Sequence, residues 1–409
     1  MYAQIEKMAA ALAPKLTAWR RHLHTIPETA WNERETSAFL ASELKRMGYE
    51  VITGNPVAGH DTGLVAELRC GGADQPVFAL RFDIDGLPVE EASDPEHLPL
   101  SLGFQSRHAG CMHACGHDGH AAIGLGCARL LQKLRHHLSG TVRLIFQPAE
   151  EGARGAAPVV EKGWLSDASY FLAGHITGRD YGGSEEPDAV PVCSSLATTK
   201  FDAVFHGRSC HGAQPEEGAS AISALSAAVL ALNAIPRHSQ GATFLNVGRI
   251  TAGEGRNVIA GFGRMEAEVR GASTELNHYM EEQAFRIIRH CAAMYGCTAD
   301  ILPQGHAPSL ESSPDFCREL AEICGKGLSS VRFAEKPEVF RASEDAAAML
   351  RTVREAGGKG AFLLFPTHTA APLHSCRYDF DETILPKAVS IFTAAVFHWC
   401  GGSLSQPPL

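Results

Sequence analysis

The segment CMHACGHDGH, at residues 111–120, carries a dense group of side chains that could bind a metal. A closed structural zinc site would need a second Cys or His pair at finger or ribbon spacing, which the neighbouring sequence lacks. A thiol nucleophile is a second alternative, but Cys115 and its base His117 would then lie unusually close in sequence. The segment therefore favours a metal site completed from elsewhere. Its candidate residues are Cys111, His113, Cys115, His117, Asp118 and His120.

Further candidate ligands follow predicted buried strands, where ligands gather in an open α/β sheet. Because adjacent side chains at a strand end point to opposite sides, Glu150 can face the water while Glu151 binds metal, or the reverse. His374 lies in a loop after another predicted strand and could join them. The remaining candidates are Asp83 and Asp85 after residues 77–82, Glu150 and Glu151 after residues 141–146, and His175 after residues 170–173.

The elements that must position these residues alternate between strand and helix, which predicts an α/β fold with a mostly parallel sheet. Residues 119–138 have the apolar periodicity of one helix face. The predicted strands cover residues 63–69, 77–82, 141–146, 170–173 and 361–365. The other predicted helices cover residues 36–47, 315–325, 343–357 and a segment after Asp381.

Between these parts, residues 198–306 follow a different plan. Apolar and polar residues alternate in several segments, as in strands with one buried face. The predicted order is β-α-β-β-α-β, the ferredoxin-like arrangement. We therefore expect residues 1–197 and 307–409 to form the two parts of one catalytic domain, with residues 198–306 inserted as a second domain.

Composition excludes several classes of function. The 409 residues contain 36 Lys and Arg against 46 Asp and Glu, a net charge of −10, so neither nucleic acid nor an anionic membrane is an expected partner. The N-terminal segment has no secretory apolar region, and no run reaches about 18 uncharged apolar residues. The 12 cysteines are scattered, which is typical of free thiols in a reducing cytoplasm.

Five ordered motifs resemble the metal-dependent amidohydrolase and carboxypeptidase family of aminoacylases, hippurate hydrolases and auxin-conjugate hydrolases. They are DIDGLP, MHACGHDGH, QPAEEG, the Ala-Gly-His at 173–175 and the Leu-His-Ser at 373–375. The resemblance spans the chain from RRHLHTIPE, at residues 20–28, onward. Within the family, ATTKFDAVFHG, GRNV and YGCTAD look like the subgroup of aminobenzoyl-glutamate hydrolases, which includes two-subunit enzymes.

This resemblance implies two divalent metal ions, manganese or zinc, bridged by Cys115. It places His117 and His175 on one ion, and Glu151 and His374 on the other. It makes Glu150 the general base, while Asp85 orients an imidazole ligand and Asp83 is a weaker candidate for that role.

The same resemblance makes the inserted domain a lid and dimerisation unit. It implies that His211 reaches into the neighbouring subunit's site and stabilises the oxyanion. Asn257 and Arg256, in the GRNV segment, match the part that binds the substrate carboxylate. Arg264 and Arg270 are further candidate partners for an anion, although Arg270 on an exposed strand face could equally be solvated.

The expected activity is hydrolysis of the amide bond of an N-acyl or N-aroyl amino acid, with aminobenzoyl-glutamate as the leading substrate. A broad aminoacylase or hippuricase is the alternative within enzymes. The chain is expected to form a homodimer through the lid, or else to be a partner-dependent subunit of a heteromeric hydrolase. Because the net charge repels an acidic substrate at a distance, its capture requires local cationic side chains.

Overall fold

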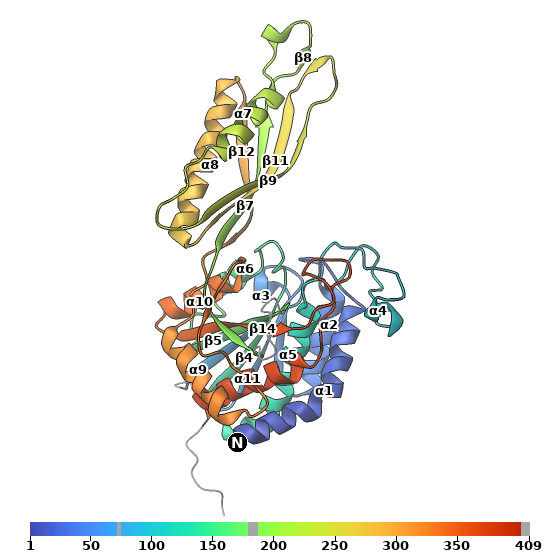
Figure 1. The fold of residues 1–409 in the computed structure, drawn as a ribbon, viewed down its shortest axis with the longest axis vertical. Coiled ribbons are helices and arrows are strands. Elements are labelled where there is room, and N and C mark those ends of the chain that lie inside the picture. Colours follow the sequence, from blue (N-terminus) through green and yellow to red (C-terminus); the bar gives the residue numbers. More distant parts are fainter. Residues whose placement is uncertain (72–74, 179–186, 402–409) are drawn as a thin grey trace, which may run out of the picture.

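The computed structural model describes residues 1–71, 75–178 and 187–401, which form two units (Figure 1). One unit, here called the body, is built around an eight-stranded sheet from segments on both sides of the other unit in sequence. The other, here called the inserted unit, runs from Ala197 to Ala307 and extends away from the body as an elongated arm.

The sheet of the body has the strand order β1-β2-β4-β3-β5-β14-β6-β13. Its centre is parallel, because β4, β3, β5 and β14 pair in parallel, whereas β1, β2 and β6 join antiparallel neighbours and β13 pairs parallel with β6. The predicted α/β fold with a mostly parallel sheet is confirmed. The strands are β1 (Glu50–Thr53), β2 (Leu64–Arg69), β3 (Val77–Asp83), β4 (Thr141–Gln147), β5 (Tyr170–Gly178), β6 (Val190–Ser195), β13 (Glu338–Phe340) and β14 (Lys359–Thr367).

Helices cover both faces of this sheet, so its central strands are apolar on both sides. In β3, Phe78, Leu80 and Phe82 pack into the core beneath α1, α5 and α11. Ala79, between them, packs into the second core on the other face, beneath α6 and α10. The helices are α1 (Tyr2–His24), α2 (Arg34–Arg46), α3 (Asn55–Ala58), α4 (Leu98–Ser101), α5 (His117–Leu134), α6 (Ala156–Glu161), α9 (Pro314–Gly327), α10 (Ala346–Glu355) and α11 (Ile384–Cys400).

The inserted unit is an antiparallel sheet of order β12-β7-β11-β9 with its own hydrophobic core. Along the chain its main elements follow the order β-α-β-β-α-β. A two-stranded ribbon of β8 (Cys210–His211) and β10 (Val258–Ile259) lies at the end farthest from the body (Figure 1). The main elements are β7 (Ala197–His206), α7 (Ala221–Asn233), β9 (Thr243–Ala252), β11 (Phe262–Gly271), α8 (Thr274–Met294) and β12 (Thr298–Ala307).

The inserted unit meets the body through a close backbone contact. The His306 N–H donates to the Ala153 carbonyl at 3.0 Å. A Cβ atom on the adjacent Gly305 would lie 1.8 Å from the Gly152 oxygen, so only glycine fits there. The loop that carries Glu150 and Glu151 therefore packs directly against the base of the inserted sheet.

Two element boundaries differ from the sequence predictions in ways that affect the site. Helix α5 begins at His117, earlier than the predicted Gly119, because Gly116 precedes it with a left-handed φ of 84°. Strand β5 continues past Ala173 to Gly178, since its pairing with β14 extends that far. His175 consequently lies within a strand and not after its end. Among the described residues, no helix combines the length and apolarity that crossing a membrane requires.

Candidate metal centre

Five predicted ligands converge at one edge of the body. Cys115, His117 and His175 have donor atoms within 4.8 Å of one another, and so do Cys115, Glu151 and His374. Cys115 belongs to both groups, which is the geometry expected of a shared ligand. The ligands come from the N-terminus of α5 and the loop before it, the loop after β4, strand β5 and the loop after β14.

The carboxylate of Asp85 organises this convergence. His117 donates through Nδ1 to the Asp85 carbonyl oxygen at 2.9 Å and to its carboxylate at 3.2 Å. The same carboxylate accepts the backbone N–H groups of Glu150, at 3.1 Å, and Glu151, at 2.9 Å. Asp85 thus fixes the orientation of one imidazole and the position of the Glu150–Glu151 loop.

The donor atoms that remain unpaired fit a cation. With Nδ1 of His117 protonated, its Nε2 carries the lone pair, and this atom is buried without a hydrogen-bond partner. Glu151 Oε1 is buried without a hydrogen-bond partner as well. His175 donates through Nδ1 to the Ile176 carbonyl at 2.6 Å, which leaves its Nε2 3.3 Å from Cys115 Sγ. Buried polar atoms without partners are costly, so their concentration here indicates a ligand site.

Burial also sets the protonation of these groups. It lowers the pKa of His175 well below its usual value and lowers that of His374, which keeps both imidazoles in the neutral form that binds metals. Burial raises the pKa of the Cys115 thiol well above its usual value. A thiolate at this position therefore needs a nearby cation to stabilise it.

Glu150 lies beside a buried acidic pair, Glu344 and Asp345, and the three carboxylates are within 4.8 Å of one another. Burial, followed by the charge of Glu344, raises the pKa of Glu150 well above its usual value. Arg81 crosslinks the cluster, contacting Glu344 at 3.1 Å and Asp345 at 2.9 Å. A carboxyl group with a raised pKa holds a proton more readily than an ordinary carboxylate, which suits proton transfer in catalysis.

Asp83 has a different role from Asp85. It forms a hydrogen bond with Nδ1 of His120 and an ion pair with Arg81 at 2.7 Å. The other ring nitrogen of His120 accepts the Ile176 N–H at 2.8 Å, so neither nitrogen of His120 is free for a metal. Asp83 therefore fixes a buried histidine that is not a candidate ligand.

The candidate residues of the inserted unit do not join this cluster within the chain. His211 is in β8, and the Gly212 N–H bonds to the Asn257 carbonyl at 2.8 Å, so His211, Arg256 and Asn257 gather at the distal end (Figure 1). Arg264 pairs with Asp202 at 2.5 Å, and Arg270 pairs with Glu268 at 3.0 Å.

Sequence reasoning did not select Arg81, Glu344 and Asp345 as site residues. Glu344 and Asp345 lie just before α10, more than 250 positions from Arg81, so no local spacing reports their contact. The one available signal is an arginine within the apolar strand β3, because a buried arginine requires acidic partners.

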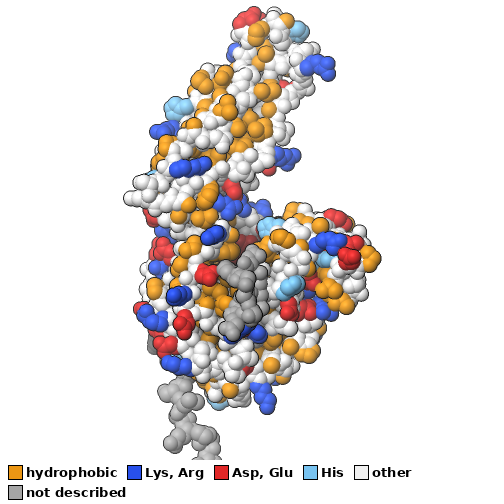
Figure 2. All heavy atoms as spheres, viewed as in Figure 1, with side chains coloured by type: hydrophobic (Ala, Val, Ile, Leu, Met, Phe, Trp, Pro, Cys, Tyr) orange, Lys and Arg blue, Asp and Glu red, His pale blue; other side chains and the backbone are white. Residues whose placement is uncertain are grey.

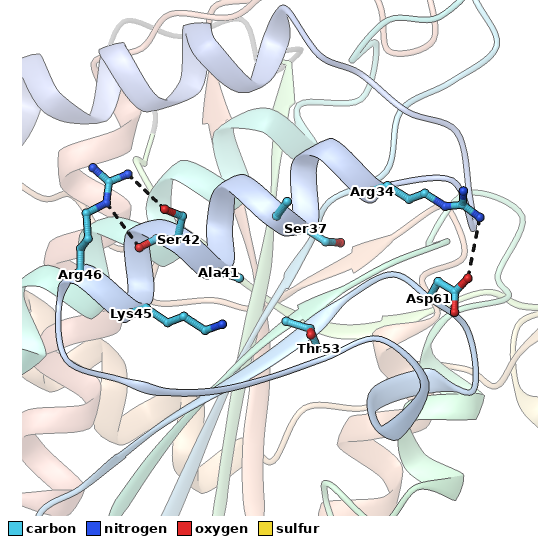
Figure 3. A pocket seen from close by; sticks show the side chains of 9 residues that line it. Arg34, Ser37, Ala41, Ser42, Lys45, Arg46, Thr53 and Asp61 are labelled. Carbon is cyan, nitrogen blue, oxygen red and sulfur yellow. Dashed lines mark hydrogen bonds and ion pairs between the residues drawn. The ribbon is translucent and has the colours of Figure 1, made fainter.

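A cavity of about 750 Å³ lies elsewhere, against α2 (Figure 3). Its ionic and polar groups largely satisfy one another: Arg34 is 3.8 Å from Asp61, and Arg46 bonds to Ser42. The residues that line this cavity do not include a group of metal-binding side chains like the one beside Asp85. The candidate functional site is therefore the group of ligands around Asp85.

Comparisons with known proteins find similar sequences over nearly the whole chain. Residues 79–398, which include the whole cluster, match the model of peptidase family M20/M25/M40. The chain is 38% identical to a subunit of p-aminobenzoyl-glutamate hydrolase from Escherichia coli (strain K12), over 97% of this chain and 99% of that protein. It is 36% identical to indole-3-acetyl-aspartic acid hydrolase of Enterobacter agglomerans, over 96% and 98%.

A solved structure is similar over nearly the full length. The YXEP protein of Bacillus subtilis, a dinuclear metal binding peptidase from the M20 family, has a TM-score of 0.70 and 28% identity. The similarity covers 95% of this chain and 99% of that one.

Proposed function

Because the chain belongs to peptidase family M20/M25/M40, we propose that it is a metal-dependent amidohydrolase acting on N-acyl or N-aroyl amino acids, with aminobenzoyl-glutamate as the leading substrate. The observation that carries this proposal is the clustering of Cys115, His117, Glu151, His175 and His374 beside Glu150. The names of the similar hydrolases support an acylated acidic amino acid as the substrate.

We further propose that the cluster holds two divalent ions, manganese or zinc, with Cys115 as the bridge. His117 and His175 would bind one ion, and Glu151 and His374 would bind the other. The similarity to a dinuclear metal binding peptidase supports this assignment. When bound, such ions supply Lewis-acid polarisation of the amide carbonyl and lower the pKa of water.

In this proposal, Glu150 takes the proton of the attacking water and passes it to the leaving amine. Its raised pKa suits both steps, because the proton must be held between them and then released. Asp85 keeps Glu150 in place through its bond to the Glu150 N–H. The products are a carboxylic acid and an amino acid.

We propose that residues 1–197 and 307–409 form the catalytic domain and that residues 198–306 form a ferredoxin-like lid and dimerisation domain. The described residues of the inserted unit expose large apolar side chains, including Leu230, Phe244 and Ile250, and Figure 2 shows hydrophobic side chains along this unit. Such a surface is typical of an interface, which favours a homodimer.

In a dimer, the distal end of one inserted unit can serve the metal centre of the other subunit. His211 would there stabilise the oxyanion, and Asn257 and Arg256 would bind the substrate carboxylate. Arg270 is a further candidate, but it lies at the base of the inserted sheet and pairs with Glu268. The position of β8, away from the body of its own chain, supports this arrangement (Figure 1).

A partner-dependent subunit is the second candidate, and it is favoured by the name of the Escherichia coli relative, which describes one subunit of a hydrolase. A broad aminoacylase or hippuricase would share the same metal chemistry. We place the protein in the cytoplasm, because none of the 12 cysteines forms a disulfide bond, which is typical of a reducing compartment.

The test is hydrolysis by the purified chain alone after loading with manganese or zinc. We expect turnover of acylated Glu or Asp above that of acylated Phe or Leu, and loss of turnover after exhaustive chelation. Activity that survives chelation but is abolished by a thiol reagent would contradict the metal mechanism. Activity only after addition of a second polypeptide would favour the partner-dependent subunit.

A further inference from the structure

Lys200, in strand β7, is positioned at the junction between the metal centre and the inserted sheet. Its direct partner across the β7–β12 pair is Gly305. Gly305 packs against Gly152, the residue that follows the candidate ligand Glu151. Lys200 therefore lies near the metal centre of its own chain. The distal His211, in contrast, lies far from that centre (Figure 1).

The face of the inserted sheet that carries Lys200 contains several charged side chains. The charged side chains around Lys200 are paired with one another. Glu268, the partner of Lys200 across β11, accepts two hydrogen bonds from Arg270, each at 3.0 Å. Asp202 is held by Arg264 at 2.5 Å and by Gln304 at 2.9 Å.

Among the described residues, no acidic oxygen lies within the 4.0 Å that would make an ion pair with Lys200. The half-buried residue Lys200 lines a cavity of about 360 Å³ on this face, together with Asn246, Gln304 and the paired charged residues of the same face. A cation that is partly shielded from water and lacks a counterion attracts an anionic ligand group more strongly than a fully solvated cation does.

The backbone contacts place Lys200 beside the metal centre of its own chain. Gly305, the partner of Lys200, packs on Gly152, one residue after Glu151, and the His306 N–H donates to the Ala153 carbonyl at 3.0 Å. A substrate whose amide lies at the metal centre would therefore have its amino-acid part near Lys200.

We propose that Lys200 binds the side-chain carboxylate of an acidic amino acid in the substrate and so selects acylated Glu or Asp over neutral amino acids. This inference rests on the proposed function and names its specificity-determining residue. The compact, flexible ammonium of lysine suits the binding of a single carboxylate. It also supplies the local positive charge that a chain of net charge −10 needs to capture an acidic substrate.

The experiment compares two substrates of the same shape, aminobenzoyl-glutamate and aminobenzoyl-glutamine, with the manganese-loaded full-length protein. In Lys200→Gln, we expect KM for the glutamate compound to rise about tenfold to a hundredfold, the value of a charged hydrogen bond. We expect kcat to stay within about threefold, and both constants for the glutamine compound to stay within the same range. Lys200→Arg should retain part of the preference for glutamate.

The matched control is Arg249→Gln, which removes one positive charge from the exposed edge strand β9 of the same sheet. It should leave the preference unchanged. If Lys200→Gln lowers kcat/KM equally for both substrates, Lys200 acts on the shared α-carboxylate or on the metal centre. If neither kcat/KM changes, Lys200 has no part in specificity. Either result overturns the inference. Failure of the unaltered protein to hydrolyse any acylated amino acid would instead contradict the proposed function, and the inference with it.

Discussion

Asp85 joins three parts of the metal centre through one side chain. It receives the Nδ1–H of His117 and the backbone N–H groups of Glu150 and Glu151. A carboxylate that binds the far nitrogen of a ligating imidazole fixes its tautomer and raises its basicity. Asp85 thereby couples the orientation of a ligand to the position of the general base.

Asp85→Asn should therefore weaken metal binding by about tenfold to a hundredfold, because the amide lacks the negative charge and brings an N–H₂ group toward N–H donors. Competition with a chelator of known affinity measures the change. Asp61→Asn, at a carboxylate whose side chain is 80% exposed, is the control and should bind metal normally. Unchanged affinity in Asp85→Asn would remove Asp85 from this role.

Glu150→Gln should lower kcat by about a hundredfold to ten-thousandfold, the range of general acid and base catalysis. Its metal content should equal that of the unaltered protein, because Glu150 is outside both groups that contain Cys115. Elemental analysis and steady-state kinetics on the same preparation separate the two effects. Loss of metal together with activity would make Glu150 a ligand.

Glu33 gives a pH dependence of stability. Its Oε1 accepts the Ala149 N–H at 2.9 Å beneath the Glu150 loop, and burial, together with the charge of Asp85, raises its pKa to about 7. Because the pKa of Glu33 is lower in the unfolded chain, the folded state binds this proton more tightly than the unfolded state does. The stabilisation is therefore present at acidic pH and is lost as pH rises through about 7.

Between pH 5 and 8, the free energy of unfolding of the chelated protein should fall by about 3 kcal/mol from this group, an upper value for a shift of this size. In Glu33→Gln, which cannot ionise, the fall over this pH range should be smaller by that amount. Urea unfolding at several pH values measures both. Parallel pH profiles for the two proteins would show that Glu33 ionises normally.

A buried guanidinium in α1 links this helix to two other segments of the body. Arg20 contacts Asp118, in the first turn of α5, at 2.8 Å and Asp379, in the segment before α11, at 2.7 Å. The Asp118 carboxylate also binds His24 at 2.7 Å. This network holds the start of α5, where His117 is located.

Arg20→Met should lower the free energy of unfolding by about 3–5 kcal/mol, because it leaves buried carboxylates without their cation. The neighbouring Arg21 is the control: it pairs with the partly exposed Glu382, and Arg21→Met should cost less than about 1 kcal/mol. Urea denaturation of both variants gives the two values. Similar losses in both would show that the buried network adds no special stability.

The central strands could be predicted from sequence because burial on both faces makes them continuous apolar runs, as in Ala361–Phe365. The site residues could be predicted because Cys115 and His117 belong to one dense segment at the start of a helix, and Glu150 and Glu151 follow strand β4 closely. The extension of β5 to Gly178 could not be predicted, because it depends on pairing with β14, nearly 190 positions away in sequence.

The pairing of the charged side chains around the site could not be predicted either. The sequence pattern does not show that Asp345 meets Arg81, or that Arg270 satisfies Glu268 and leaves Lys200 unpaired. Such facts depend on which strands become neighbours. Motifs that are local in sequence can be interpreted before the fold is known, whereas contacts between distant segments follow from topology.

At the scale of the whole molecule, the distal position of β8 predicts that two chains build each active site (Figure 1). His211→Ala and Glu150→Gln should each be inactive as homodimers. Mixed after unfolding and refolding together, they should regain about a quarter of the full activity, because half of the dimers are mixed and each has one intact site. Size-exclusion chromatography checks the dimer, and no regain would place His211 outside the neighbouring site.

The chain enters and leaves the inserted unit at adjacent points, since Thr198 in β7 is the direct partner of Ala307 in β12. A deletion between these positions leaves a gap that a short glycine linker can span. All five candidate ligands stay behind in the body. The unit is in this sense exchangeable: replacing one continuous stretch of the coding sequence by a unit that keeps an equivalent of His211 would retain the five ligands and change the residues that select the substrate.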